Sequence, residues 1–381
     1  MYDRKQIFED LGSESAFFWG ARQTGKTTLL KMKFPNSIYI DLLLNTEFLR
    51  FNTTPDLLRQ IVEAKQPQEP VIIDEIQRLP DLLNEIHWLI TNKGIRFILS
   101  GSSPRKIVRG GNNLLGGRAL RYELFPLVSA EIENFNLLKA LNSGLLPRHY
   151  LADNPKKLLE AYIGSYLKDE IMAESKIRNI GAFSRFLESA AFSNSEILNY
   201  SNIATDCGIS SVTVKEYFQI LEDTMIGRFL PAFTKRAKRR IIAAPKFYFF
   251  DVGIANILLK RSKIEHKSEN FGHAFEHFIY TEIYAHSQYS GLKYDISYWR
   301  TATTNIEVDF ILGESEIAIE VKSSDSISGR HLKGLSQFSE DYKPKRSIIV
   351  SMDDYYRKID HIEIMPWKFF LEELWSNKLM V

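Results

Sequence analysis

The eight residues GARQTGKT at positions 20–27 decide how the first third of this chain folds, because they fit the pattern G-x-x-x-x-G-K-[ST] at every fixed position. An apolar run of strand type, Phe17–Trp19, comes directly before them, and Thr28 opens a predicted helix. This context predicts a P-loop, in which backbone N–H groups and a helix start face phosphate oxygens. The residues expected to bind a nucleotide are Gly20, Ala21, Arg22, Gln23, Thr24, Gly25, Lys26, Thr27 and Thr28.

Four side chains have a specific expected role in this site. Lys26 would reach the β- and γ-phosphates, and Thr27 would be a ligand of Mg²⁺. A second apolar run, Val71–Ile73, ends in Asp74, which would hold the same ion, and in Glu75, which would polarise the attacking water. An acid after a strand is often only a helix N-cap. Together with the P-loop, however, the two acids predict nucleotide hydrolysis.

Further strands predict how the nucleotide site is completed. The runs IYIDLL (38–43) and GIRFILSGSSPRKI (94–107) alternate with helical patterns, which predicts a parallel, doubly wound sheet with ligand at the strand carboxyl ends. Ser100 or Ser102 would then lie near the γ-phosphate as a polar sensor. Arg118 follows a glycine pair and could reach the γ-phosphate of a neighbouring subunit as an arginine finger. Its spacing fits a surface loop arginine equally well.

Composition sets wider limits. The chain has 381 residues, enough for two or three domains, and 44% of them are hydrophobic and 25% charged, as in ordinary globular proteins. A net charge of +2 gives no positive field over the whole protein, so nucleic-acid contact would need local basic patches. The single cysteine, Cys207, excludes a disulfide framework within the chain and fits a reducing compartment. We expect a cytoplasmic protein without a membrane span.

The middle of the chain predicts a helical lid followed by a DNA-binding motif. Residues 129–190 carry apolar side chains at three- and four-residue spacing. A short helix closed by Gly208 and a second helix after Ser210 then follow the order of a helix-turn-helix. Residues 229–251 read as two strands around a basic tip, a wing that would contact DNA phosphates, with a solvated hairpin or an interdomain contact as the alternatives. The cations of this tip are Lys235, Arg236, Lys238, Arg239 and Arg240.

Four charged residues fall on two predicted strands near the carboxyl end, in IEVDFILGESEIAIEVKSS. By the two-residue period of strands, Glu307 and Asp309 share one face of the first strand, and Glu320 and Lys322 share one face of the second. If these faces align, Asp309 and Glu320 are suitable ligands for Mg²⁺. Lys322 could orient or deprotonate a water for attack on a phosphodiester. Alternating charges also arise on solvated sheet faces, so that alternative stays open.

Glu276 lies on the helix predicted before these strands, inside an apolar neighbourhood, and could complete the metal site. The order of elements after residue 263 is helix, three strands, helix, strand. That is the order expected for a restriction-endonuclease-like core.

The chain resembles a family of prokaryotic AAA-type P-loop ATPases in four stretches: GARQTGKTTLL, VIIDEIQRLPDLL, FILSGSS and LLGGRALRYELFPLVSAEI. Many members carry a C-terminal domain, formerly of unknown function, that resembles restriction-endonuclease-like PD-(D/E)XK folds. The spacing from Asp309 to Glu320-Val321-Lys322 matches the D-x(n)-E-x-K pattern of that superfamily. Gln337 and Tyr342 are five residues apart, so they do not fit the Gln-x-x-x-Tyr pattern of some of its nucleases. The resemblance implies ATP as the nucleotide and a homo-oligomer, often a hexameric ring.

The expected fold class is α/β, with a P-loop ATPase core (1–128), a helical lid (129–190), a winged helix-turn-helix (191–262) and a nuclease-like α/β domain (263–381). The expected function is an ATP-hydrolysing AAA-type protein that binds, remodels or translocates DNA, including branched or junction DNA, with a Mg²⁺-dependent nuclease-like domain. The alternative is an ATP-dependent regulatory or signalling switch whose nuclease-like domain is a docking module without catalysis.

Overall fold

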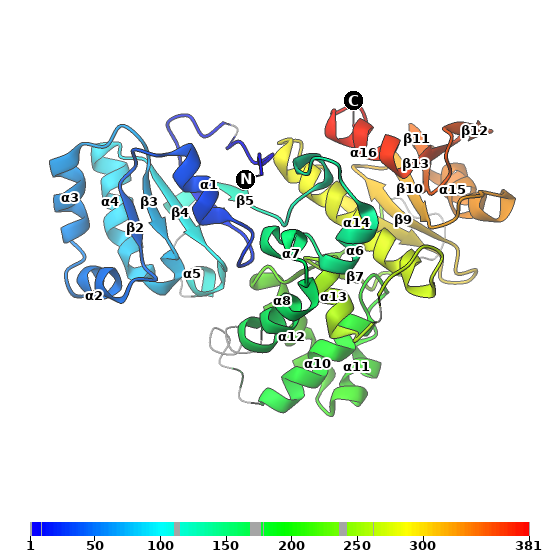
Figure 1. Ribbon diagram of the computed structural model, residues 1–381, viewed down its shortest axis with the longest axis horizontal. Helices are drawn as coiled ribbons and strands as arrows, with labels where there is room; N and C mark the ends of the chain where they lie inside the picture. Colours follow the sequence, from blue (N-terminus) through cyan, green and yellow to red (C-terminus); the bar gives the residue numbers. More distant parts are fainter. Residues whose placement is uncertain are drawn as a thin grey trace.

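A five-stranded parallel sheet forms the amino-terminal third (Figure 1). The structure, a computed structural model, describes residues 2–8, 10–109, 115–167, 177, 179–235, 242–261 and 263–380. The strands lie in the order β2-β3-β4-β1-β5, and every neighbouring pair is parallel. They are β1 (Ser15–Trp19), β2 (Tyr39–Asp41), β3 (Val71–Asp74), β4 (Phe97–Gly101) and β5 (Ala119–Glu123).

Helices cover both faces of this sheet, which explains its continuous apolar strands. Phe17 and Trp19 point into one hydrophobic core, whereas Ala16 and Phe18 point into another on the opposite face. The predicted parallel α/β fold of the ATPase core is therefore confirmed. Its helices are α1 (Lys26–Lys33), α2 (Asn45–Thr53), α3 (Leu57–Lys65), α4 (Leu83–Lys93) and α5 (Arg105–Arg109), with short 3-10 turns at Ile76–Arg78, Pro80–Leu82 and Leu115–Gly117.

The middle third is mainly helical and contains a helix-turn-helix followed by a two-stranded antiparallel sheet. Gly208 ends α11 in the left-handed region, at φ 65°, and the side chain of Ser210 caps α12 by accepting from the Thr213 amide. One hydrophobic core joins the predicted lid to the helix pair and the two-stranded sheet. The elements of the middle third are α6 (Leu137–Ser143), α7 (Pro147–Leu151), α8 (Pro155–Ala161), a π-helix η5 (Tyr162–Leu167), α10 (Ile180–Phe192), α11 (Tyr200–Cys207), α12 (Ser211–Asp223), β6 (Gly227–Leu230), β7 (Lys246–Phe249) and α13 (Val252–Leu258).

A six-stranded mixed sheet forms the carboxyl-terminal third, in the order β12-β13-β11-β10-β9-β8. Helices α14 and α16 pack against one face and α15 against the other. The elements are α14 (Glu269–Tyr289), β8 (Ile296–Arg300), β9 (Glu307–Leu312), β10 (Ile317–Lys322), α15 (Gly329–Tyr342), β11 (Arg346–Ser351), β12 (Arg357–Ile359), β13 (Ile362–Pro366) and α16 (Trp367–Trp375).

Helix α14 is 21 residues long and lies between the ATPase core and the carboxyl-terminal sheet (Figure 1). Its residues enter the same core as α6 and as strands β9 to β11. Helix α14 thus connects the region of the predicted P-loop with the strands that carry Asp309 and Glu320. Within the described residues, no helix combines the length and the apolar character needed to cross a membrane.

Candidate functional site

The P-loop wraps around its own lysine. Gly20 follows β1 without room for a side chain, since a Cβ there would lie 2.5 Å from the Leu124 carbonyl oxygen. Gly25 has φ 98°, a conformation that favours glycine, and α1 begins directly after it. Lys26 is 6% exposed, and its Nζ donates to the carbonyl oxygens of Gly20 at 2.7 Å and Ala21 at 3.2 Å. Backbone oxygens thus hold the ammonium group inside the loop.

Asp74 joins the P-loop helix to strand β2. Its Oδ2 accepts hydrogen bonds from Thr27 Oγ1, at 2.7 Å, and from the Tyr39 hydroxyl. Burial lowers the pKa of the Lys26 ammonium, and the carboxylates of Glu75 and Asp74 oppose that shift. Burial and Asp74 both raise the pKa of Tyr39. The predicted ligands Thr27 and Asp74 are therefore in direct contact, and Tyr39 orients the acid.

Glu75 is fixed by its neighbours. It has φ 60°, a value that is rare for a residue other than glycine, and its carboxylate accepts a hydrogen bond from Gln77 Nε2. Gln77 also donates to Ser102 Oγ, at 3.0 Å. Ser100 pairs with Asp74 in the β3–β4 register, but its buried hydroxyl has no hydrogen-bond partner among the described residues. Ser102 is thus the serine in contact with the Glu75 network, and the sensor role of Ser100 stays a prediction.

Arg118 lies away from the nucleotide site of its own chain. It precedes β5, whose first residue, Ala119, pairs with Ser15 at the amino end of β1. Because these strands are parallel, Arg118 lies at the edge of the sheet opposite to the P-loop. Its exposed side chain has Nη1 3.2 Å from Nε2 of His87. An action on another subunit's nucleotide remains a prediction.

An apolar cavity adjoins the P-loop where three parts of the chain meet. Ala21 of the P-loop and residues 124–128 line one side, and Arg228 of β6, Tyr280 and Tyr284 of α14 line another. Arg228 forms an ion pair with Glu123 and donates to the Tyr284 hydroxyl at 2.8 Å. The cavity is apolar, but its volume of about 40 Å³ is well below the roughly 300–1,000 Å³ of a typical small-molecule pocket, so it does not hold a flat ring as it stands.

Buried contacts connect the P-loop to α14. Arg4 donates to the Thr24 carbonyl at 2.6 Å and to the Glu131 carboxylate at 2.9 Å. Two residues before Glu131, Ser129 donates its amide and its hydroxyl to Glu282 of α14, at 2.8 and 2.7 Å. The short segment after β5 is therefore in contact with both the nucleotide loop and the carboxyl-terminal third.

Strands β9 and β10 bring the predicted acids of the second site together. They pair antiparallel, with Ile319 opposite Phe310, so that the next residue pair is Glu320 and Asp309. Asp309 Oδ2 accepts a hydrogen bond from the Val321 amide at 2.7 Å. We call Glu276, Glu307, Asp309 and Glu320 the acidic cluster.

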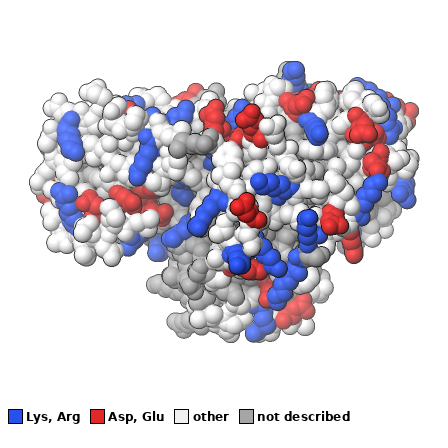
Figure 2. All heavy atoms as spheres, in the orientation of Figure 1, with Lys and Arg blue, Asp and Glu red and all other residues white. Residues whose placement is uncertain are grey.

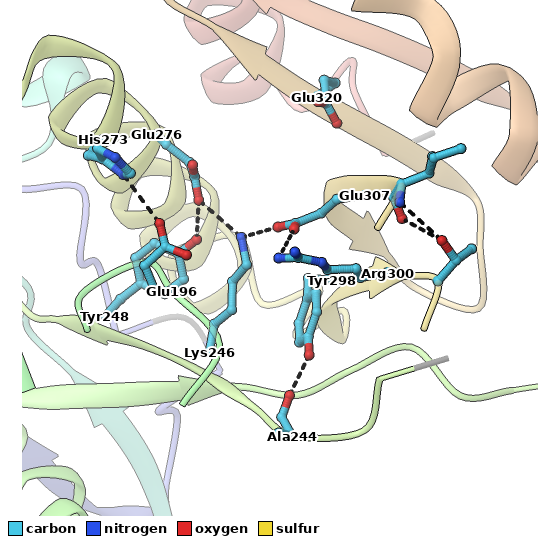
Figure 3. A network of polar contacts seen from close by, with 12 residues as sticks. Glu196, Ala244, Lys246, Tyr248, His273, Glu276, Tyr298, Arg300, Glu307 and Glu320 are labelled. Atoms are coloured by element: carbon cyan, nitrogen blue, oxygen red, sulfur yellow. Dashed lines mark hydrogen bonds and ion pairs between the residues drawn. The ribbon is translucent and has the colours of Figure 1, made fainter. Parts of the chain in front are cut away.

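Two lysines form ion pairs with the acidic cluster. Lys322 Nζ lies 2.5 Å from Glu320 Oε1. Lys246, the first residue of β7, forms an ion pair with Glu307 and lies 3.4 Å from Glu276 Oε1, between the two acids (Figure 3). Within the described part of the chain, no three His, Cys, Asp or Glu side chains converge closely enough to hold a metal ion.

Burial and mutual repulsion disfavour charge on these acids. Burial, with Asp309 nearby, raises the pKa of Glu320 to about 8, against the effect of Lys322. Burial likewise raises the pKa of Glu276 to about 7, against the effect of Lys246. For Lys246, burial lowers the pKa, but Glu276 and Glu307 outweigh it and raise the pKa overall. The lysines therefore oppose the effect of burial on Glu276 and Glu320 without cancelling it, and both carboxyl groups keep a raised pKa.

The basic tip of the predicted wing is described at one position. Lys235 forms an exposed ion pair with Glu314, at 3.0 Å, whereas Arg236, Lys238, Arg239 and Arg240 lie outside the described residues. A polar groove lies beside Ile242, the first described residue after the tip. Its lining includes Tyr200, Ser211, Lys215, Ile242 and Arg300, from the helix-turn-helix and from the hairpin and strand β8.

Sequence reasoning missed the residues that orient the predicted ones. Tyr39 and Gln77 fix the two acids of the nucleotide site, and Arg4 binds the P-loop from the amino-terminal segment. Lys246 lies in the strand predicted after the basic tip and was assigned no role. The tyrosine in the strand beside Asp74 was the one visible signal, since parallel neighbours place it near that acid.

Three family profiles match consecutive parts of the chain. Residues 13–133 match a family described as an AAA domain, residues 134–265 a domain of unknown function (DUF8612), and residues 271–370 a domain of unknown function (DUF4143). Comparison with curated proteins finds no match.

One solved structure similar to this chain is a signal transduction ATPase with numerous domains (STAND) protein with a tetratricopeptide repeat sensor, from Pyrococcus horikoshii. The identity is 15% over 74% of this chain and 48% of that chain, with a TM-score of 0.21. The profile match, the parallel sheet and the P-loop geometry agree with one another. The amino-terminal third of this chain thus matches an AAA domain and has the parallel sheet and phosphate loop of a P-loop ATPase.

Proposed function

We propose that this protein hydrolyses ATP in its AAA domain and uses that reaction to bind, remodel or translocate DNA as a homo-oligomer, in the cytoplasm. The observation that carries the proposal is the contact of Thr27 with Asp74 directly beside Lys26 and Glu75. These are the groups that ATP hydrolysis requires, and they come from the P-loop with the start of α1 and from the carboxyl end of β3, at a single edge of the sheet.

The residues present fit ATP and Mg²⁺. Thr27 and Asp74 would hold Mg²⁺, which supplies charge neutralisation at the β- and γ-phosphates when bound. Lys26 can turn from the backbone carbonyls of Gly20 and Ala21 to the phosphates without leaving the loop. Glu75, held by Gln77, would orient and deprotonate the attacking water.

The DNA-directed part of the proposal rests on the helix-turn-helix and on the charge of residues 235–240. Figure 2 shows Lys and Arg side chains interspersed with Asp and Glu on the face in view, as the net charge of +2 implies. A local basic segment would therefore be the main source of phosphate contacts. Lys215 and Arg300 in the polar groove would extend those contacts toward the acidic cluster.

A nuclease-like role of the acidic cluster belongs to the same proposal. Asp309 and Glu320 would hold Mg²⁺, and Lys322 would position the attacking water. Glu320 supports this assignment because its Oε2 atom is buried and has no hydrogen-bond partner among the described residues. A buried carboxylate oxygen of this kind normally has a partner, and a divalent cation would supply one.

A second candidate function is a regulatory switch with a docking domain that does not cut. Its support is the pairing of Lys246 with Glu276 and Glu307, because a permanently neutralised cluster needs no metal ion.

One experiment tests these proposals together. Purified full-length protein is incubated with Mg²⁺ and ATP on single-stranded, duplex and four-way-junction DNA, and phosphate release, binding and cutting are scored in parallel. We expect Glu75→Gln to abolish phosphate release while ATP still binds. We expect Asp309→Asn to abolish cutting and leave phosphate release intact. If the wild type hydrolyses ATP but never cuts, the docking function replaces the nuclease-like one.

Salt dependence tests the DNA contacts. Replacing the five cations of 235–240 with glutamine should weaken binding to every DNA form and flatten its dependence on salt concentration. Replacement of Lys156, Lys157 and Lys260, which are exposed lysines of the helical region, is the matched control. Binding that is unchanged by the first set contradicts the DNA-directed reading.

A further inference from the structure

Lys246 enters the acidic cluster from a different part of the fold. The four acids belong to α14, β9 and β10, whereas Lys246 begins β7 of the two-stranded sheet. Its side chain crosses to Glu276 and Glu307, and the residue is 3% exposed (Figure 3). Burying a lysine this completely is costly unless acids compensate its charge. The contacts with Glu276 and Glu307 therefore compensate the burial of the Lys246 charge at this site.

The charge count shows what Lys246 replaces. Three of the four carboxylates contact three cations, with Lys246 between Glu276 and Glu307, Lys322 on Glu320, and Arg300 3.0 Å from Glu307 Oε2. Asp309 instead accepts from the Val321 amide. When all four acids are ionised, one formal negative charge remains with Lys246 in place and two remain without it, which is the charge that a divalent cation neutralises.

The orientation of the acids agrees with this count. Glu276 and Glu307 are turned to Lys246, and Asp309 is turned to the Val321 amide, so three acids do not converge in the described part of the protein. Glu320 nevertheless keeps one buried oxygen without a partner there. Glu320 thus has unused capacity for a cation, while Lys246 occupies the space between Glu276 and Glu307.

The hairpin limb that supplies Lys246 is docked on the edge strand of the same sheet. The Ile242 amide donates to the Arg300 carbonyl at 3.0 Å, and the Tyr298 hydroxyl donates to the Ala244 carbonyl. A ligand that displaces residues 242–245 from β8 would also withdraw Lys246 from the acidic cluster, because Lys246 directly follows this segment in the chain.

We propose that Lys246 is the resident counter-ion of the acidic cluster and that a divalent cation binds there when Lys246 withdraws. The inference rests on the proposed assignment of Asp309 and Glu320 as metal ligands. Lys246 would then be a positioning residue that controls occupancy of the site.

Titration calorimetry with Mn²⁺ tests this inference. The protein is the nucleotide-free full-length chain carrying Asp74→Asn, so that the P-loop contributes no metal site. We expect Lys246→Met to raise the Mn²⁺ affinity at least tenfold, and Asp309→Asn to abolish binding in that variant. Lys260→Met, which removes an exposed ion pair with Glu188, is the matched control and should bind as the parent does.

The outcomes separate the two proposals. Equal Mn²⁺ affinity with and without Lys246, lost on Asp309→Asn, overturns the counter-ion role and leaves the metal site standing. If neither protein binds Mn²⁺, the metal assignment fails, and the counter-ion inference fails with it.

A second measurement uses the unmutated chain and so does not depend on a variant that folds. Lys246 is too buried to react with an acetylating reagent in the state seen here. Saturating Mn²⁺ should increase its acetylation at least fivefold, read by mass spectrometry, while exposed Lys260 reacts equally in both conditions. Binding of Mn²⁺ with Lys246 still protected contradicts the inference.

Discussion

Two buried lysines, Lys26 and Lys246, occupy the two candidate sites in opposite electrostatic settings. Lys26 donates to backbone carbonyls, and burial lowers the pKa of its ammonium group. Lys246 lies between two carboxylates, which raise its pKa despite burial. Lys26 contacts uncharged backbone oxygens and has yet to meet the phosphates of a nucleotide. Lys246 is already paired with two carboxylates. A nucleotide should complete the first site, and a cation has to compete for the second.

Removing Lys26 should have the largest effect of any change that tests this difference between the two lysines. We expect Lys26→Met to lower the ATP hydrolysis rate roughly a thousandfold, equivalent to about 4 kcal/mol, because its ammonium group would stabilise the charge that develops on the β- and γ-phosphates. The rate of phosphate release under saturating ATP measures the effect. Lys33→Met, at an exposed position of the same helix, serves as the control. A loss below tenfold would mean that the P-loop binds ATP without catalysing its hydrolysis.

The next effect contrasts the two lysines in stability. Lys246→Met should lower the free energy of unfolding by about 3 kcal/mol, because it leaves two largely buried carboxylates without their cation. Lys26→Met should change it by less than about 1 kcal/mol, since its partners are backbone oxygens and its charge is costly to bury. Urea unfolding of both variants, without nucleotide or metal, gives the two values. Equal losses would show that the two settings do not differ.

The nucleotide site was largely predictable from the sequence and the acidic cluster was not. Residues 20–27 form one contiguous motif, and the rule for parallel strands places Asp74 and Glu75 beside it. The pairing of Asp309 with Glu320 also followed from strand periodicity. Lys246 precedes its partners Glu276 and Glu307 by 30 and 61 residues, and its contacts depend on how β7 docks beside α14. Such docking leaves no local pattern, so the sequence analysis assigned the lysine no role.

Glu282 of helix α14 should make the free energy of unfolding depend on pH. Burial raises the pKa of Glu282 to about 7, although Trp375 and Ser129 donate to its carboxylate. Ionisation is then easier in the unfolded chain, so the free energy of unfolding should fall as pH rises from about 5 to about 7. Glu282→Gln should remove about 2 kcal/mol of this fall. Urea unfolding at both pH values tests it, with the exposed Glu265→Gln as the control.

The same variant tests whether α14 links the two lysines. Glu282 and Glu276 lie on one helix, and Ser129 lies two residues from Glu131, which Arg4 ties to the P-loop. If the link operates, ATP should change Lys246 acetylation in the wild type but not in Glu282→Gln. In the urea experiment, a free energy of unfolding that depends on pH equally in the wild type and in Glu282→Gln would show that Glu282 is ionised equally in the folded and unfolded chains.

The smallest expected effect concerns the tyrosine that orients Asp74. Tyr39→Phe removes one hydrogen bond to the acid and should raise the Mg²⁺ concentration for half-maximal ATP hydrolysis about fivefold, equivalent to about 1 kcal/mol. Tyr355→Phe, at an exposed tyrosine, should have no effect. A changed maximal rate with an unchanged Mg²⁺ requirement would mean that Tyr39 acts on the chemical step. Because Tyr39 touches Asp74 and not Lys26, a pure shift in Mg²⁺ requirement would show that the first site, like the second, keeps its metal ligands in position through a neighbour from another strand.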